Sequence, residues 1–215
     1  MVISDQFPLS RQILKLEQEV LRMGALVENS FWLAHSAMFE RNLENATQLD
    51  SQDKQVDILY RHVEVECLDL ITRYSPTTPE DLRLLSTFMQ LVRDLERIGD
   101  YAENLGEIAI KLFPYPPPPH LELVRIMSNR CRAMLAMSLG ALSNYDAELA
   151  AQVKFKDDAV DADYAHIYDL ISQSQDYGAL EPLLLMILVI HHLERMADHA
   201  TNIGQRIAYI VTGKR

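Results

Sequence analysis

The phrase LERIGDYAENLG (residues 95–106) returns later in the chain as LERMADHATNIG (residues 193–204). Leu, Glu, Arg, Asp, Ala, Asn and Gly stand at matching places in the two phrases. In each phrase the first Glu, the Asp and the Asn follow one another at every fourth residue, so in an α-helix their side chains lie on one face. The sequence therefore predicts an internal repeat, each copy of which carries an acidic stripe on a helix.

The composition around these phrases is that of a helical globular protein. Hydrophobic residues make up 48% and charged residues 24% of the 215 residues, which is typical of a chain with a packed core. Only 7 residues are glycine, so the backbone seldom needs a left-handed conformation. Apolar residues recur at the helical spacing of three and four, as in Ile13, Leu16, Val20, Met23 and Val27. We expect an all-α fold.

The segment PYPPPP (residues 114–119) divides the chain, because its prolines lack amide donors and keep the backbone extended. In each half an amphipathic segment, residues 9–46 or residues 120–145, precedes a helical hairpin. We therefore expect two tandem antiparallel three-helix bundles that form an internal repeat. The predicted domains are residues 1–113 and residues 120–215, with residues 114–119 as the linker.

Turn signals mark the two predicted hairpins. In RYSPTTPEDL, Thr78 is expected to cap a new helix, with Pro79 at its first position and Asp81 in its first turn. The counterpart in the second half is SQDYGALEPLL, where Gly178 provides a permissive turn residue and Pro182 follows it.

The formal net charge of −11 opposes approach to nucleic acid and to anionic lipid, so we expect no nucleic-acid partner. The apolar run LLLMILVI (residues 183–190) is far shorter than the roughly 20 residues that cross a bilayer, and we expect a helix buried on every side. The first residues show no secretory signal. Cys67 and Cys131 lack zinc or disulfide spacing and are expected to be buried thiols of a cytoplasmic protein.

Two acidic pairs in each half lie at equal distances from the turn of the predicted hairpin. Residues equidistant from the turn of an antiparallel hairpin lie at the same height, so four carboxylates can meet in each half. The pairs are Asp53 with Asp57 and Glu96 with Asp100 in the first half, and Asp157 with Asp161 and Glu194 with Asp198 in the second.

Four carboxylates that face one another repel unless a cation lies between them. Arg97 and Arg195 could serve, but each directly follows its glutamate and would have to curl back around the helix. A metal ion meets the requirement more simply, because all-oxygen sites suit magnesium, calcium, manganese or ferric iron. Asn104 and Asn202 could each add an oxygen ligand.

Solvated acidic surface is the alternative interpretation, because so acidic a chain contains pairs at this spacing by chance. Glu40 with Glu44 and Glu103 with Glu107 have no counterpart in the other repeat, and we expect them to be surface of this kind.

No enzyme signature is visible in the sequence. The chain has no Gly-x-Ser-x-Gly, no phosphate-binding glycine loop and no Glu-x-x-His pair. Imidazole ligands to zinc or iron are the weaker option, since His199 corresponds to Tyr101 in the first repeat. Apart from the two motif arginines we expect no convergent positive charge, so the chain is not expected to be an enzyme.

Two three-helix repeats that each carry two acidic motifs resemble the PhoU family of phosphate-signalling proteins. The motifs here are DKQVD, ERIGDYAEN, DDAVD and ERMADHATN. The resemblance implies metal ions or multinuclear clusters of iron, zinc, manganese or magnesium on the helix surface. The implied ligands are Asp53, Asp57, Glu96, Asp100 and Asn104 in the first repeat, and Asp157, Asp161, Glu194, Asp198 and Asn202 in the second.

The same resemblance implies a cytoplasmic homodimer that negatively regulates phosphate uptake and signalling. Members restrain the phosphate-starvation response as adaptors that contact a sensor histidine kinase and the ATPase subunit of the phosphate ABC transporter. They reach the membrane only through these partners. A metal-dependent hydrolase acting on phosphate compounds and a structural helical scaffold remain alternatives, distinguished by metal content and a phosphatase assay.

Overall fold

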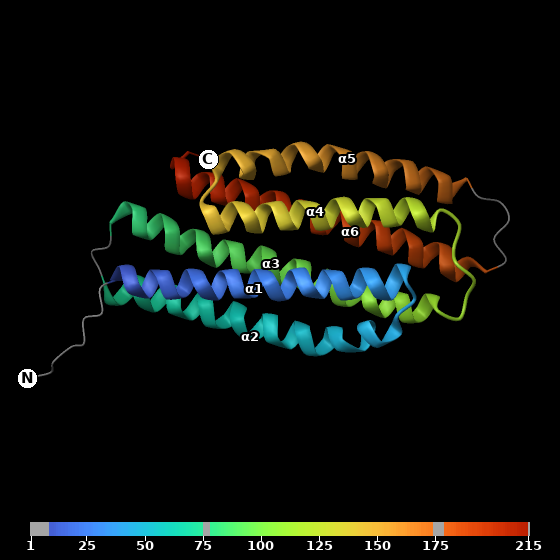
Figure 1. Cartoon of the computed structure of the whole chain (residues 1–215), viewed down its shortest axis with the longest axis horizontal. Helices are drawn as coiled ribbons and strands as arrows, with labels where there is room; N and C mark the ends of the chain where they lie inside the picture. Colours follow the sequence, from blue (N-terminus) through green and yellow to red (C-terminus); the bar gives the residue numbers. More distant parts are fainter. Residues whose placement is uncertain (1–8, 75–77, 174–178, 215) are drawn as a thin grey trace, which may run out of the picture.

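The computed structural model describes residues 9–74, 78–173 and 179–214, which form six long helices and no strand. All six helices run roughly along the long axis of the molecule (Figure 1). The all-α fold of tandem bundles is therefore confirmed. The helices are α1 (Leu9–Phe39), α2 (Leu43–Arg73) and α3 (Pro79–Leu112) in the first repeat, and α4 (Leu121–Asn144), α5 (Ala147–Ser172) and α6 (Leu180–Thr212) in the second.

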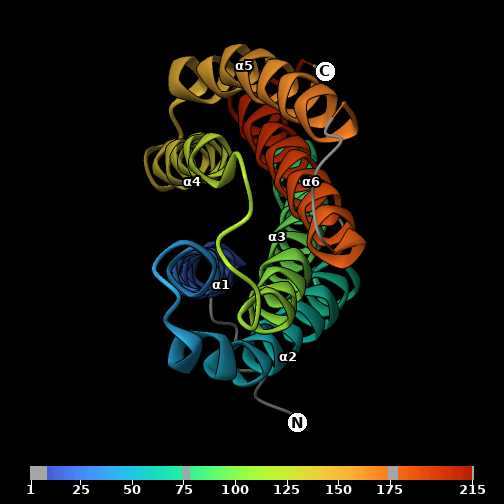
Figure 2. The ribbon, with the colours of Figure 1, turned by 90° about the vertical axis from the view of Figure 1, so that its right-hand side faces the viewer.

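The two repeats pack side by side through two helix pairs. Figure 2 shows α3 against α6 and α1 against α4, while α2 and α5 lie on the outside. Buried apolar side chains of all six helices form one continuous core cluster. The predicted stripe on α1 belongs to this cluster, because Ile13, Leu16, Val20, Met23 and Val27 are all buried. The contact between α3 and α6 places the two repeated phrases next to each other.

Two local features mark the turns between the helices of the first repeat. The segment predicted as one amphipathic unit over residues 9–46 is divided, because the chain breaks after Phe39 and Arg41 adopts a left-handed φ of 58°. The start of α3 is as predicted: the Asp81 amide donates to Thr78 Oγ1 at 3.1 Å, and Pro79 occupies the first turn. The predicted turn role of Gly178 lies outside the described residues.

The linker is held against both repeats. The Arg41 guanidinium lies over the Phe113 ring at 4.7 Å and donates to the Tyr115 carbonyl at 3.3 Å. The Tyr115 hydroxyl donates to the Glu181 carboxylate at the start of α6. Side-chain contacts therefore fix the linker in addition to the stiffness of its prolines.

The glycine that ends each repeated phrase permits a close approach of two helices. A Cβ added to Gly106 would lie 2.2 Å from the Leu49 Cδ1 of α2. At Gly204 an added Cβ would lie 2.8 Å from the backbone carbonyl oxygen of Ala150 in α5. The repeat of this glycine therefore reflects packing between the second and third helices of each bundle.

The prediction that residues 183–190 are buried on every side is wrong. Leu184 and Leu188 are 56% and 45% exposed, and Leu180, one turn earlier, is 68% exposed. An uninterrupted apolar run does not reveal which side of a helix faces the core, so the exposed side was not visible in the sequence. No helix among the described residues is both long and apolar enough to cross a membrane. Cys67 and Cys131 are buried free thiols, as predicted.

Candidate metal-binding carboxylate clusters

The first cluster consists of Asp53 and Asp57 on α2 and Glu96 and Asp100 on α3. The four side chains are close enough to influence one another's ionisation. Burial raises the pKa of Asp53 above its ordinary value, and the charges of Asp100 and Asp57 raise it further. Burial likewise raises the pKa of Glu96, and Asp100 adds to the increase. The antiparallel pairing of α2 with α3 thus brings together the four acids that the sequence placed at equal distances from the turn.

One oxygen of this cluster has no protein partner. The Oδ1 atom of Asp53 is buried and makes no hydrogen bond within the described residues. The oxygen faces Gly99 on α3, where an added Cβ would lie 3.8 Å from it, at ordinary van der Waals distance. A buried carboxylate oxygen without a donor is costly, and a bound cation would remove that cost.

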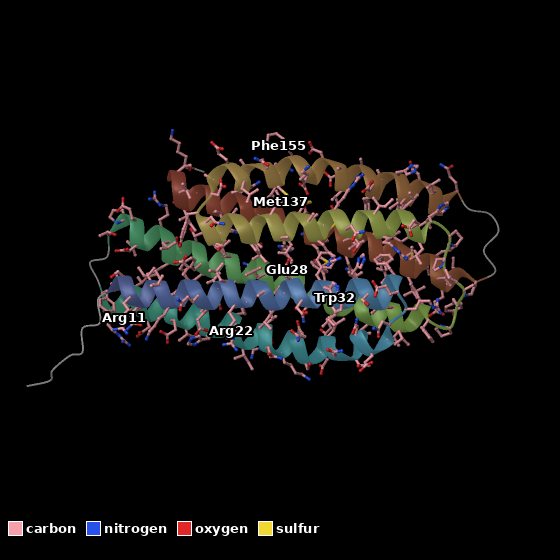
Figure 3. All side chains as sticks on the ribbon, in the orientation of Figure 1. Arg11, Arg22, Glu28, Trp32, Met137 and Phe155 are labelled. Atoms are coloured by element: carbon pink, nitrogen blue, oxygen red, sulfur yellow. The ribbon has the colours of Figure 1, made fainter. Side chains whose placement is uncertain are left out.

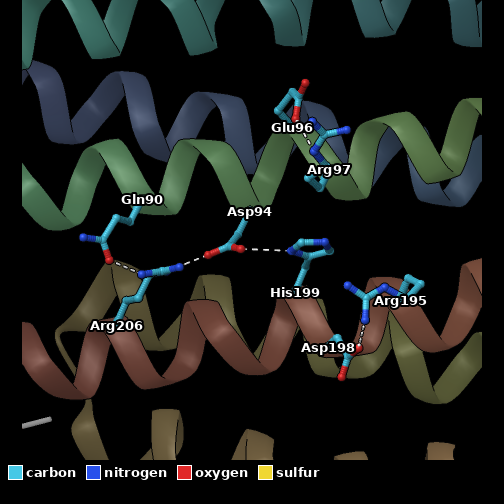
Figure 4. Close-up of polar contacts among 8 residues, drawn as sticks. All are labelled: Gln90, Asp94, Glu96, Arg97, Arg195, Asp198, His199 and Arg206. Atoms are coloured by element: carbon cyan, nitrogen blue, oxygen red, sulfur yellow. Dashed lines mark hydrogen bonds and ion pairs between the residues drawn. The ribbon is translucent and has the colours of Figure 1, made fainter.

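Arginines that we expected to be badly placed do reach the first cluster. Arg97 curls back, with Nε 3.4 Å from the Glu96 carboxylate (Figure 4) and Nη1 3.0 Å from that of Asp100. Arg61, one turn after Asp57, donates to its carboxylate at 2.6 Å. Both arginine side chains are at least half exposed, so water screens the charge they contribute.

The first cluster extends further than the sequence analysis foresaw. Burial raises the pKa of Glu103, and the charges of Asp53 and Asp50 add to that effect. Glu103, which is partly buried, therefore lies within the acidic surroundings of the first cluster. The signal was available, because Glu103 stands three residues after Asp100 on the same helix.

The second cluster consists of Asp157 and Asp161 on α5 and Glu194 and Asp198 on α6. Burial, followed by the charge of Asp157, raises the pKa of Asp161. Burial, followed by the charge of Asp198, raises the pKa of Glu194. The second repeat therefore also brings its four predicted acids into mutual reach.

A lysine distinguishes the second cluster. The Lys154 ammonium lies 2.7 Å from the carboxylate of Asp157, which is buried. Arg195 also curls back to Asp198, at 2.6 Å (Figure 4). Lys154 precedes Asp157 by three residues, so its position on the same face could have been recognised from the spacing.

The asparagines stand at the margins of the clusters. The Asn104 amide donates to the backbone carbonyl of Asp100 at 2.9 Å and is exposed. Asn202 is partly buried on α6. Among the described residues, no hydrogen bond joins either asparagine side chain to a carboxylate of a cluster.

The donor chemistry of the clusters fits a hard metal ion, although the side chains do not converge on one point. Among residues 9–74, 78–173 and 179–214, no three Asp, Glu, His or Cys side chains are arranged to hold a metal ion as they stand. The carboxylates lie on adjacent helices and influence one another's ionisation, and a common ion would require them to change rotamer. The first cluster fits better, because it contains the unpartnered oxygen of Asp53 and because its neighbouring lysine, Lys54, is paired with Asp50 rather than with one of the four acids.

A largely buried ionic network lies between α3 and α6, beside the repeated phrases. The carboxylate of Asp94 on α3 accepts from Arg206 Nε at 2.6 Å and lies 2.9 Å from His199 Nδ1, both on α6. Arg206 also donates to the Gln90 side chain (Figure 4). Sequence reasoning missed this network, because the placement of one repeat on the other is not encoded in local spacing.

Fold and site together define a class of protein: six helices in two three-helix repeats, each with a carboxylate cluster between its second and third helices. The family model described as "PhoU domain" matches residues 20–109 and 124–207. The chain belongs to the PhoU family, and the resemblance seen in its acidic motifs is confirmed.

Relatives and solved structures agree with this assignment. The chain is 53% identical over 202 residues to the "Phosphate-specific transport system accessory protein PhoU homolog" of Synechocystis sp., covering 94% of this chain and 90% of that protein. The crystal structure of PhoU from Pseudomonas aeruginosa matches with a TM-score of 0.92 at 30% identity, covering 96% of this chain and all of that one. The phosphate transport system regulatory protein PhoU from Streptococcus pneumoniae gives 0.87 at 26% identity, covering 96% of this chain and 98% of that one.

Proposed function

We propose that this chain is an accessory regulator of phosphate-specific transport that restrains the phosphate-starvation response from the cytoplasm. The observation that carries the proposal is that both repeats match the PhoU family over nearly their whole length. The similarity to a protein named as a phosphate transport accessory protein extends over 94% of the chain. Regulation rather than catalysis is the proposed activity.

In this proposal the two carboxylate clusters hold metal ions, either iron, zinc, manganese or magnesium. Asp53, Asp57, Glu96 and Asp100 supply the oxygen ligands of the first site. The ion would supply positive charge that offsets the repulsion between these acids. The raised pKa values of Asp53, Glu96 and Asp100 support the proposal, because they reflect burial of these acids first and the charge of neighbouring carboxylates second.

The proposed partners are a sensor histidine kinase, the ATPase subunit of the phosphate ABC transporter and a second copy of the chain. Exposed leucines support a role in docking: Leu180, Leu184 and Leu188 lie on successive turns of α6 and are each at least 45% exposed. Apolar side chains repeated at this spacing on a surface helix favour contact with another protein.

A deletion strain tests the regulatory role. Without this protein, phosphate-starvation genes should be expressed even in phosphate-rich medium, and the wild-type chain should restore repression. Pull-down from a lysate should recover the transporter ATPase or the kinase. Normal repression in the deletion strain would overturn the proposal, and phosphate release from phosphate esters by the metal-loaded protein would favour a hydrolase.

A further inference from the structure

A groove that borders the second carboxylate cluster at Lys154 lies between α5 and α6, at the end of the molecule where α3 begins. Its volume is about 770 Å³, within the range of small-molecule sites. Its walls include Lys154 and Phe155 of α5, Arg206 and Tyr209 of α6, Lys214 beyond α6, and Gln90 of α3. Both repeats therefore contribute to the groove.

The charge of the groove is opposite to that of the whole chain. Three cations line it, whereas none of the described residues that line it is acidic. Arg83 of α3 stands at the same rim, with its guanidinium carbon 5.9 Å from the centre of the Tyr209 ring. The expectation that positive charge does not converge outside the motif arginines is wrong, because these cations come from segments far apart in the sequence.

Two of the cations that line the groove are paired with buried carboxylates. Lys154 pairs with Asp157, and Arg206 pairs with the buried Asp94. Lys214 and Arg83 add charge at the open rim. The groove therefore offers cations paired with buried carboxylates, together with further cations at its rim.

The aromatic side chains give the groove a second property. Phe155 is 76% exposed and stands on the outer edge of α5 (Figure 3), and the partly buried Tyr209 lies on α6. An exposed phenyl ring beside cations suits a ligand that has both a flat ring and a negative charge. Two side-chain amides, from Gln90 and Gln205, can donate to and accept from a polar ring edge.

We propose that this groove binds a nucleoside phosphate, with the base against Phe155 and Tyr209 and the phosphates at Lys154, Lys214 and Arg83. A fatty acid would not use the amides, and inorganic phosphate would not use the rings. Arg206 and Gln90 belong both to the groove and to the network between α3 and α6, so an occupied groove would act on the contact between the repeats.

The test is calorimetric titration of the full chain with ADP, in EDTA so that metal at the carboxylate clusters does not bind phosphate. We expect saturable binding of one ADP per chain that weakens as salt is raised. Phe155→Ser and Lys214→Gln should each weaken binding about fivefold or more, since a stacked base and a phosphate contact are of that size. Matched controls on the exposed side of α5 outside the groove, Lys156→Gln and Tyr168→Ser, should change the affinity less than about twofold.

Further titrations distinguish the contribution of the base from that of the phosphates and test the alternative ligands. Adenosine and pyrophosphate should each bind more weakly than ADP, and Phe155→Leu, which keeps an apolar side chain without a ring, should also weaken ADP binding. Absence of saturable binding, equal binding of ADP and pyrophosphate, or equal effects of the groove and control variants would overturn the proposal. So would a change in oligomeric state of Phe155→Ser on sedimentation, which would make the groove an interface between copies of the chain.

Discussion

The two carboxylate clusters are built from the same phrase but stand in different electrostatic surroundings. In the first cluster a buried oxygen of Asp53 has no hydrogen bond within the described residues, Glu103 adds further negative charge, and the nearby Asp50 is paired with Lys54. In the second cluster Lys154 occupies the place of Asp50 in the repeat and pairs with Asp157. The comparison teaches that equivalent motifs need not be equivalent sites, because one neighbouring residue of the chain can supply positive charge and so weaken the site for an external cation.

The interface between the repeats shows a similar difference. Asp94 directly precedes the first phrase as His192 precedes the second, and His199 stands at the position of Tyr101. Asp94 has two partners from α6, whereas His192 lies against the Tyr101 ring at 5.3 Å with a buried Nδ1 that has no hydrogen bond within the described residues. Burial lowers the pKa of His192, which favours its neutral form.

The largest effect should come from breaking the polar end of this interface. Arg206→Met leaves the buried Asp94 without its guanidinium partner, and should cost about 3 kcal/mol of unfolding free energy, at the low end for a buried pair because Arg206 is partly exposed. The matched change His192→Phe at the other end removes an unpaired polar atom and should be close to neutral. Urea unfolding measures the change in unfolding free energy for both variants. Equal losses would contradict the predicted difference between the two ends of the interface.

The two glycines that end the repeated phrases should also differ in how much stability is lost on substitution, but by a smaller amount. Gly204→Ala places a Cβ against backbone, which cannot easily move, and should cost about 1–3 kcal/mol. Gly106→Ala meets the end of the Leu49 side chain, which can change rotamer, so the loss should be smaller. Melting temperatures of the two variants compare them, and a greater loss at Gly106 would contradict this account of the packing.

A smaller effect concerns the charge of the first cluster. Without metal, Asp53→Asn should stabilise the protein by about 0.5 kcal/mol at pH 7, because it removes one of several like charges. Asp157→Asn should instead destabilise it, because Lys154 loses its carboxylate. Chemical unfolding in EDTA measures both changes, and stabilisation by both substitutions would mean that Lys154 does not compensate the second cluster.

The gain from Asp53→Asn should depend on pH in a defined direction. The folded-state pKa values of Asp53, Glu96 and Asp100 are raised, so between the ordinary and the raised values the folded protein binds more protons than the unfolded chain. The contribution of these groups to stability therefore falls as pH rises through that window. The advantage of Asp53→Asn should be largest at neutral pH and smallest below the ordinary pKa of the acids. An advantage that grows as the pH is lowered would contradict the assigned direction.

Local patterns predicted the helices and the pairing of the acids, because both follow from spacing along the chain. The cap at Thr78 was predictable for the same reason. The position of Lys154 could have been read from its spacing to Asp157, whereas the partners of Asp94 could not, since they depend on how one repeat packs on the other. The exposed side of the run at Leu184 was also hidden, because apolar composition alone does not say which neighbour covers a helix.

The most direct test of the unequal clusters is a titration of metal-free protein with Mn²⁺, followed by calorimetry. Wild type should show two classes of site, with the tighter one removed by Asp57→Asn with Glu96→Gln. The equivalent pair in the second repeat, Asp161→Asn with Glu194→Gln, should remove the weaker one and leave the tighter unchanged. Mn²⁺ at a hundred times its dissociation constant should add about 2.7 kcal/mol to the stability of the native state. If both double variants bind as much Mn²⁺ as wild type, with the same affinities, the carboxylate clusters are not the metal sites and the account is wrong.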